Sequence, residues 1–291
     1  MAIGPGARAA VIGAGYLGRR IALRLRNAGF SVVTTAVSDT SLERLRSEGF
    51  EAQRLDLDRP DTYFSVADAA CLVVCPAPSD SSDDGYARLY GAGLPRLCAW
   101  LAERRPVPRV LYTSSTSVIR ETGGDWVDES AAFDDSRPKP AALLAAETAV
   151  MAAPLAGTVL RLAGIYGPER NRLASLETGT LATPSPDDIA NIIHVDDAAA
   201  AAVFLLQRGS PGEVYLGVDC APTPRTELYA WLATEAGITV PRVATASIPE
   251  RRGGQKRCSN RKLLSLGFMF TNPSYRHGYR EILEAYRNRP R

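Results

Sequence analysis

Lysine, histidine and long apolar runs are scarce in this sequence. Only three of its 34 basic residues are lysines, and it has two histidines. Because 32 acidic residues leave a net charge of +2, the charge balance gives no sign of a nucleic-acid partner. No stretch approaches the roughly 18 uninterrupted apolar residues of a membrane helix, and the first residues lack a signal-peptide pattern. We therefore expect a cytoplasmic protein with no nucleic-acid partner and no membrane partner.

Cysteine is also sparse and irregularly placed. The five cysteines are odd in number and show no metal-ligand spacing, so neither a disulfide framework nor a metal site is expected. We expect them to be buried core thiols. They are Cys71, Cys75, Cys98, Cys220 and Cys258.

What the sequence does contain is a regular alternation of strand-like and helix-like segments. Short apolar runs predict strands at 9–12, 31–35, 51–55, 70–75, 109–113 and 157–162. Helical patterns lie between them at 17–28, 40–48, 86–104 and 140–153, the second opening on a capping box of Thr40 and Glu43. This order predicts an α/β fold, a doubly wound parallel Rossmann sheet with a small interleaved C-terminal substrate lobe. Residues 1–165, joined by about 190–215, would form the dinucleotide-binding domain, and residues 166–291 mainly the lobe.

A glycine-rich turn follows the first predicted strand and opens the first helix. It reads Gly13-Ala14-Gly15-Tyr16-Leu17-Gly18. In a dinucleotide-binding turn the first glycine permits the tight bend, the second lets the backbone approach a pyrophosphate, and the third lets helix and strand pack closely. The helix N-terminus would face the phosphates. The turn therefore predicts a nicotinamide dinucleotide site.

A run of hydroxyl residues lies at the end of the fifth predicted strand, where ligands bind in parallel sheets. It reads Thr113-Ser114-Ser115-Thr116-Ser117. One interpretation is a turn whose hydroxyls satisfy backbone groups. The other is that one hydroxyl holds a substrate oxygen beside the nicotinamide.

These features together resemble the extended short-chain dehydrogenase/reductases, the NAD-dependent epimerase/dehydratase group. The resemblance is carried by the glycine turn, Asp56-Leu57-Asp58, the hydroxyl run through Val118, Arg161 to Pro168, and Asn191 to Ala198. It implies that Ser115, or else Ser117, orients the substrate. The tail, from Lys256 to Asn260 and on to Arg276, is similar to an atypical bacterial branch of the group.

The same resemblance implies a set of cofactor contacts along the chain. Asp56 and Leu57 would lie near the adenine, and Ala163 and Ile165 beside the nicotinamide. The full set expected to bind the cofactor is Gly13, Gly15, Tyr16, Leu17, Gly18, Ser38, Asp56, Leu57, Pro76, Ala163 and Ile165.

One departure from the family pattern bears on the reaction. The family's acid/base pair is a Tyr with a Lys four residues later, and here those positions hold Lys139 and Leu143. Proton transfer could instead fall to Lys139 or Tyr166, although Lys139 is equally suited to a solvated surface and Tyr166 to a structural role. His194 is expected to be structural, and Asp196 and Asp197 to cap the following helix.

The choice between NAD and NADP depends on the end of the second strand. No acid stands at Ala36 or Val37, where NAD-binding folds place one, and Asp39 is equally suited to capping a helix. Arginines that could reach a phosphate are Arg19, Arg20 and Arg44. This pattern favours NADP.

A dense basic cluster near the C-terminus is either a solvated face or a site for an anionic substrate group. It comprises Arg251, Arg252, Lys256, Arg257, Arg261 and Lys262. The leading hypothesis is an NAD(P)-dependent oxidoreductase that transfers hydride to or from a small hydroxyl, carbonyl or imine substrate. The alternatives are a non-redox isomerase, dehydratase or cyclase on the same fold, and a non-catalytic dinucleotide sensor. The resemblance also implies a possible homodimer.

Overall fold

The computed structural model describes residues 3–181, 184–239 and 254–289. The chain forms two compact units, each assembled from three separate stretches. Unit 1 comprises Met1–Val118, Phe133–Arg161 and Ala198–Tyr215, and unit 2 comprises Ile119–Ala132, Leu162–Asp197 and Leu216–Arg291. Residues 119–132 fall within the range expected for the dinucleotide-binding domain, but in the structure they group with the C-terminal part of the chain.

Seven strands form the main sheet, in the order β11-β7-β5-β4-β1-β2-β3. β1 lies between β2 and β4 and is parallel to both, so the strand order reverses beside it. This arrangement confirms the predicted doubly wound α/β fold. The strands are β1 (Arg8–Ile12), β2 (Ser31–Ala36), β3 (Glu51–Arg54), β4 (Cys71–Val74), β5 (Arg109–Ser115), β7 (Thr158–Leu162) and β11 (Val214–Gly217).

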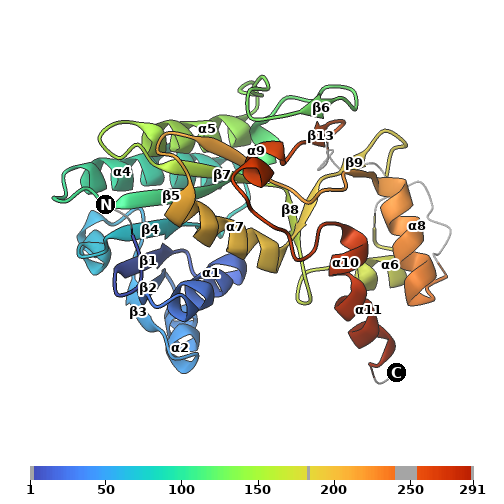
Figure 1. The fold of residues 1–291 in the computed structure, drawn as a ribbon, viewed down its shortest axis with the longest axis horizontal. Helices are drawn as coiled ribbons and strands as arrows, with labels where there is room; N and C mark the ends of the chain where they lie inside the picture. The colour runs from blue at the N-terminus through green and yellow to red at the C-terminus, as the bar shows by residue number, and fades with distance from the viewer. Residues whose placement is uncertain (1–2, 182–183, 240–253, 290–291) are drawn as a thin grey trace. The chain divides into compact units, whose positions relative to one another are not determined.

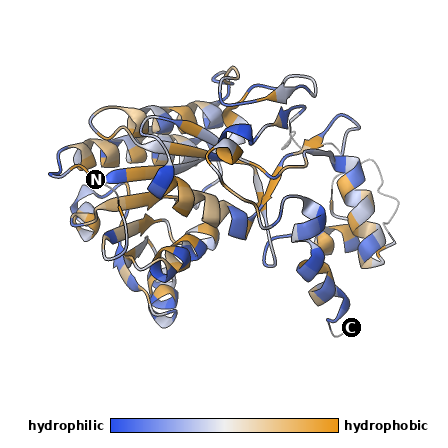
Figure 2. Cartoon of the chain, in the orientation of Figure 1, coloured by the Kyte–Doolittle hydropathy of each residue, from blue (hydrophilic) through white to orange (hydrophobic). Residues whose placement is uncertain are grey.

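The central strands are apolar on both faces because helices cover both faces of the sheet. In β1, residues 9–12 are at most 2% exposed, and all four residues of β4 are buried. Figure 1 shows two helices, α4 (Leu94–Ala102) and α5 (Pro138–Met151), together on one side of the strands. Two others, α1 (Tyr16–Asn27) and α7 (Val195–Arg208), lie on the other side. Figure 2 shows the apolar colour concentrated in these strands.

The helical segments of this part depart from prediction at two points. The predicted helix 86–104 is three consecutive segments: α3, a π-helical turn η2, and α4. Helix α2 begins at Asp39 with Ser38 as its N-cap, whose hydroxyl accepts a hydrogen bond from the Ser41 N–H (3.3 Å), so the predicted Thr40–Glu43 capping box is wrong. The segments are α1 (Tyr16–Asn27), α2 (Asp39–Ser47), η1 (Pro60–Val66), α3 (Asp83–Tyr86), η2 (Ala87–Gly93), α4 (Leu94–Ala102), η3 (Thr116–Val118), α5 (Pro138–Met151) and α7 (Val195–Arg208).

Unit 2 has a core of its own, built from three short strand pairs and small helices. The pairs are β6 (Trp126–Val127) with β13 (Arg257–Cys258), β8 (Gly164–Tyr166) with β10 (Ile192–His194), and β9 (Ile189–Ala190) with β12 (Thr223–Pro224). The helices are α6 (Leu173–Glu177), α8 (Arg225–Ala236), α9 (Arg261–Ser265), α10 (Tyr275–Gly278) and α11 (Arg280–Arg287). Tyr166, Leu232 and Tyr279 pack at the centre of this second core.

The cysteines follow the prediction with one exception. Cys71, Cys98 and Cys258 are buried and Cys75 is half-buried, but Cys220 is exposed. Cys220 lies in the loop between β11 and β12, where its N–H donates to the Pro273 carbonyl and its sulfur accepts from Asn260 Nδ2. Within the described ranges, no helix is long and apolar enough to cross a membrane.

Candidate functional site

Two of the three glycines in the β1–α1 turn are required by the packing of the chain itself. Gly13 has φ +86°, and a Cβ at this position would come within 2.6 Å of the Pro76 Cα. A Cβ on Gly18 would lie 2.5 Å from the Gly13 carbonyl oxygen. Both contacts are far inside van der Waals distance, so side chains at these positions would force the backbone apart.

Gly15 differs because a side chain there would meet no other part of the fold. Its backbone has φ −81° and ψ −144°, and a Cβ on it would meet no atom within 4 Å. Gly15 is the N-cap of α1, whose first turn has neither a side-chain cap nor an acidic residue. Open space therefore adjoins the first N–H groups and the positive end of the helix dipole of α1, which is the environment that an anion such as a pyrophosphate requires.

The segments expected near the adenosine lie beyond the ends of β2 and β3. Ser38 is occupied as the cap of α2, and Asp39 forms an ion pair with Arg54. In the next loop, the Asp56 carboxylate accepts from the Asp58 N–H (3.0 Å), and the Leu57 carbonyl accepts from the Tyr63 hydroxyl (2.7 Å). These contacts hold both loops in defined conformations.

Two of the arginines proposed for the NADP phosphate have partners within the protein. Arg19 forms an ion pair with Glu48 at 2.6 Å. Arg20 donates to the Tyr16 carbonyl and lies over the Tyr16 ring, 4.6 Å from its centroid. At the end of β2, the guanidinium of Arg54 contacts the Val37 carbonyl as well as Asp39.

The hydroxyl run begins inside β5 rather than after it. Ser115 is the last residue of the strand, and its hydroxyl oxygen accepts from the Ser117 N–H at 3.1 Å, at the start of η3. This is the backbone-satisfying role considered from the sequence. Accepting that bond leaves the Ser115 hydroxyl hydrogen available to a ligand.

Lys139 lies in the first turn of α5, where its ammonium pairs with Asp83. The Nζ–Oδ1 distance is 3.6 Å, and Nζ lies 5.5 Å from the centroid of the Tyr86 ring. Both partners belong to α3, so the lysine links the starts of two helices. One turn further along α5, Leu143 is buried in the core.

Tyr166 occupies the interior of unit 2. Its ring stacks on Tyr279 (centroids 4.8 Å apart, planes at 8°) and meets His194 edge-on at 5.3 Å. Its hydroxyl is buried and has no hydrogen-bond partner among the described residues. Burial, reinforced by Asp219, raises the pKa of this phenol far above its ordinary value. The surroundings of Tyr166 are those of a core residue.

The acidic residues expected to cap α7 have different roles. Asp197 is buried and its two carboxylate oxygens accept from the N–H groups of Thr271 and Asn272, both at 2.8 Å. His194 Nδ1 accepts from the Asp196 N–H at 3.3 Å. The predicted capping role of Asp197 is therefore wrong, because its carboxylate fixes the segment before α10.

The basic cluster does not form one solvated face. Arg251 and Arg252 lie outside the described residues. Lys256 is buried, donating to the Ile119 carbonyl (2.9 Å) and to Glu121 (3.1 Å), and Arg257 donates to the Gly124 carbonyl. These two cations hold residues 119–124 in place.

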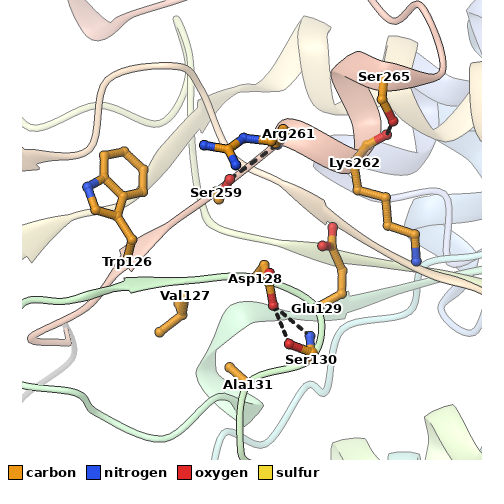
Figure 3. A pocket seen from close by; sticks show the side chains of 10 residues that line it. All are labelled: Trp126, Val127, Asp128, Glu129, Ser130, Ala131, Ser259, Arg261, Lys262 and Ser265. Carbon is orange, nitrogen blue, oxygen red and sulfur yellow. Dashed lines mark hydrogen bonds between the residues drawn. The ribbon is translucent and has the colours of Figure 1, made fainter.

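Arg261 and Lys262 instead face a cavity of about 730 Å³ within unit 2 (Figure 3). Asp128 and Glu129 contribute opposite charges to the same cavity. Burial raises the pKa of Glu129, whose carboxylate accepts from the Leu216 N–H at 2.8 Å. The lining residues are Trp126, Val127, Asp128, Glu129, Ser130, Ala131, Ser259, Arg261, Lys262 and Ser265.

Comparison with known proteins assigns the chain to a family. Residues 9–216 match the NAD dependent epimerase/dehydratase family. The chain belongs to this family. Protein YeeZ of Escherichia coli (strain K12) is 27% identical over 282 residues, covering 91% of this chain and 96% of YeeZ.

One further solved structure and one named enzyme are also similar to this epimerase/dehydratase family member. A solved structure from Methylobacillus flagellatus, described as an NAD-dependent epimerase/dehydratase, has 30% identity and a TM-score of 0.76, covering 97% of this chain and 99% of that one. The 3-diazoavenalumate denitrifying reductase of a Streptomyces species is 26% identical over 193 residues, which are 58% of this chain and 63% of the reductase.

The residues of this family member fit the cofactor that the family's name implies. Gly15 leaves an open cradle at the N-terminus of α1, with Gly13 and Gly18 packed tightly on either side. Among the described residues, no group of His, Cys, Asp or Glu could hold a metal ion.

Two structural residues of this family member, Tyr90 and Asp219, were not predicted from its sequence. Tyr90 donates from its hydroxyl to the Pro76 carbonyl at 2.9 Å. Asp219 is buried with one carboxylate oxygen lacking a partner in the described part of the chain, and its pKa is raised to about 7 by burial. Neither residue stands in a recognisable motif, so the only available signal was a polar group within an apolar stretch.

Proposed function

We propose that the protein is an NAD(P)-dependent oxidoreductase acting on a small hydroxyl, carbonyl or imine substrate. The observation that carries the proposal is Gly15. A Cβ at this position would meet no atom within 4 Å, which leaves room for a ligand at the N-terminus of α1. The N-terminus of α1, with its positive dipole end, suits the pyrophosphate of a dinucleotide.

The bound cofactor would supply or accept the hydride. Ser115 is proposed to orient the substrate. Its oxygen already accepts from the Ser117 N–H, so its hydroxyl can donate to a substrate oxygen or nitrogen. Ser117 is the second candidate for this role.

Proton supply limits the substrates that suit this site. Helix α5 contains no tyrosine, and Lys139 at its start is paired with Asp83. A carbonyl that receives a hydride also needs a proton, whereas an iminium ion that receives a hydride becomes a neutral amine without one. The absence of a tyrosine on α5 therefore favours iminium-type acceptors, with a carbonyl served by water or by Lys139. The name of the Streptomyces relative, a reductase of a diazo compound, is consistent with reduction at nitrogen-containing groups.

If the cofactor is NADP, the arginine proposed to bind its 2′-phosphate is Arg54, and not Arg19, Arg20 or Arg44. Arg54 contacts the Val37 carbonyl at the end of β2, where the adenosine ribose binds in this fold. Its ion pair with Asp39 would have to open to receive a phosphate. Arg261 and Lys262 are proposed to serve an anionic group of the substrate.

Calorimetric titration with NADH, NADPH, NAD⁺ and NADP⁺ tests the proposal. We expect micromolar or tighter binding of at least one of the four, and loss of binding in Gly15→Asp, which places a carboxylate against the pyrophosphate. Ser115→Ala is the matched control, because it should bind the dinucleotide as the wild type does. A panel of imines and carbonyls is then tested by loss of reduced-nicotinamide absorbance. No binding in the wild type, or unchanged binding in Gly15→Asp, would refute the proposed site. Tight binding without turnover on any of the panel would favour the dinucleotide sensor.

A further inference from the structure

The wall against which the glycine turn packs is the backbone of Cys75 and Pro76. A Cβ on Gly13 would lie 2.6 Å from the Pro76 Cα, 2.7 Å from the Pro76 nitrogen and 2.8 Å from the Cys75 carbonyl oxygen. The Cys75 thiol donates to the Gly13 carbonyl at 3.4 Å. Any movement of the Pro76 backbone would therefore displace the glycine turn.

Tyr90 holds this wall from the other side. Its hydroxyl donates to the Pro76 carbonyl at 2.9 Å, and the side chain is 7% exposed. Its ring packs against Tyr86 (centroids 5.3 Å apart) and Tyr112 (6.4 Å). Tyr112 lies in β5, three residues before Ser115, so Tyr90 contacts both the wall of the cofactor turn and the strand that carries the proposed substrate-orienting serine.

The π-helical turn explains how Tyr90 reaches Pro76. In an α-helix each residue is rotated by about 100° from the one before, so a change of one residue in register turns a side chain to a different face. The wider turn of η2, residues 87–93, changes the register between α3 and α4. Tyr90 faces Pro76 while Leu94 and Leu97 of α4 remain in the core.

The same π turn supports a second loop of the cofactor site. A Cβ on Gly93 would lie 2.9 Å from the Leu57 Cβ, so the helix backbone approaches Leu57 as closely as packing permits. η2 thus contacts Leu57 through Gly93 and Pro76 through Tyr90. Both contacted residues belong to the expected set of cofactor-binding residues.

We infer that Tyr90 is a positioning residue for the dinucleotide: its hydroxyl, placed by the π turn, fixes Pro76 and so keeps the glycine turn in its binding conformation. The inference rests on the proposed dinucleotide site. Without the hydroxyl, part of the population would hold the turn in other conformations, and the apparent affinity would fall in proportion to the remaining fraction.

The test compares Tyr90→Phe with Tyr86→Phe by calorimetry with NADH and by hydrogen exchange of the amides of residues 12–18. Loss of one hydrogen bond predicts that Tyr90→Phe binds NADH roughly two- to tenfold more weakly, with faster exchange in the turn. Tyr86→Phe removes the neighbouring phenol, for which the structure records no hydrogen bond in the described ranges, and should leave both readouts unchanged. The melting temperature of each variant shows whether it is folded at the assay temperature.

The outcomes separate the inference from the proposed function. NADH binding that is equal in Tyr90→Phe and wild type would overturn the positioning role and leave the dinucleotide site standing. Equal weakening in both variants would also overturn it, because general loosening of the aromatic cluster would then explain the effect. Should the wild type bind none of the four nucleotides, the dinucleotide site and the role of Tyr90 would fall together. If Tyr90→Phe is not folded at the assay temperature, the same comparison is made at a lower temperature at which both variants are folded.

Discussion

Glu147 and Arg161 form a buried ion pair whose disruption should destabilise the protein strongly. Both side chains are 1% exposed. Arg161 Nε lies 3.0 and 3.2 Å from the two carboxylate oxygens, and Nη2 lies 2.7 Å from Oε2. The pair joins α5 to β7, and the Phe133 ring covers the guanidinium at 4.8 Å.

The expected loss of unfolding free energy depends on which charged group each variant leaves buried without a partner. Arg161→Met leaves a carboxylate buried without its cation, which costs about 3–5 kcal/mol of unfolding free energy. Glu147→Gln keeps an acceptor oxygen but leaves the buried guanidinium without its anion, so it should also cost about 3–5 kcal/mol. The double variant Glu147→Leu/Arg161→Met removes both charges and should lie closer to wild type than Arg161→Met does, because an apolar pair pays no desolvation.

Urea unfolding followed by circular dichroism measures these differences. The pairwise coupling is obtained by comparing the double variant with the sum of Arg161→Met and Glu147→Leu. A loss below about 1 kcal/mol in Arg161→Met, or a double variant as unstable as the sum of its single variants, would refute the reasoning. Phe133→Leu is a useful control, since it alters the cover of the pair and leaves both charges in place.

Three further predictions concern single side chains. Burial raises the pKa of Asp219 to about 7. Between about pH 4 and pH 7 the folded state therefore holds a proton that the unfolded state has lost. As a result, the free energy of unfolding decreases as the pH rises through that range. Asp219→Asn should therefore raise the melting temperature at pH 8, by an amount corresponding to as much as about 4 kcal/mol, and change it little at pH 4; an equal change at both pH values would contradict the assignment. Ser38→Ala removes the cap of α2 and should cost about 1 kcal/mol in urea unfolding, whereas Thr40→Ala should cost less. Gly13→Ala should destabilise the fold even without nucleotide, because its methyl group would meet Pro76; a variant as stable as wild type would show that the turn can relax.

The main sheet could be predicted because its determinants are local. β1 and β4 are buried on both faces, so each appears in the sequence as a continuous run of apolar residues. The glycine turn between β1 and α1 is recognisable by its fixed spacing. The cap of α2 was misplaced because Ser38, Asp39 and Thr40 are all acceptable capping residues, and the local sequence does not distinguish among them.

Long-range contacts explain the other misses. Lys256 and Arg257 were expected in a basic cluster that is either a solvated face or a site for an anionic group, but their partners, Ile119 and Gly124, lie far away in the sequence. Asp197 was read as a cap because acids near a helix start usually are, whereas its actual partners belong to residues 271 and 272. The π turn was missed because a period of 3.6 residues fits the whole stretch almost as well as three separate segments do.

The order of the strands has a consequence for how this chain is made. β11, residues 214–217, is the edge strand beside β7, yet the stretch of unit 2 from residue 162 to residue 197 is synthesised between these two strands. On the ribosome, the nascent sheet therefore presents the open edge of β7 until β11 emerges. Open strand edges pair readily with other chains. Nascent chains halted before residue 214 should therefore recruit a chaperone or aggregate, whereas chains halted after β11 has emerged should do so much less.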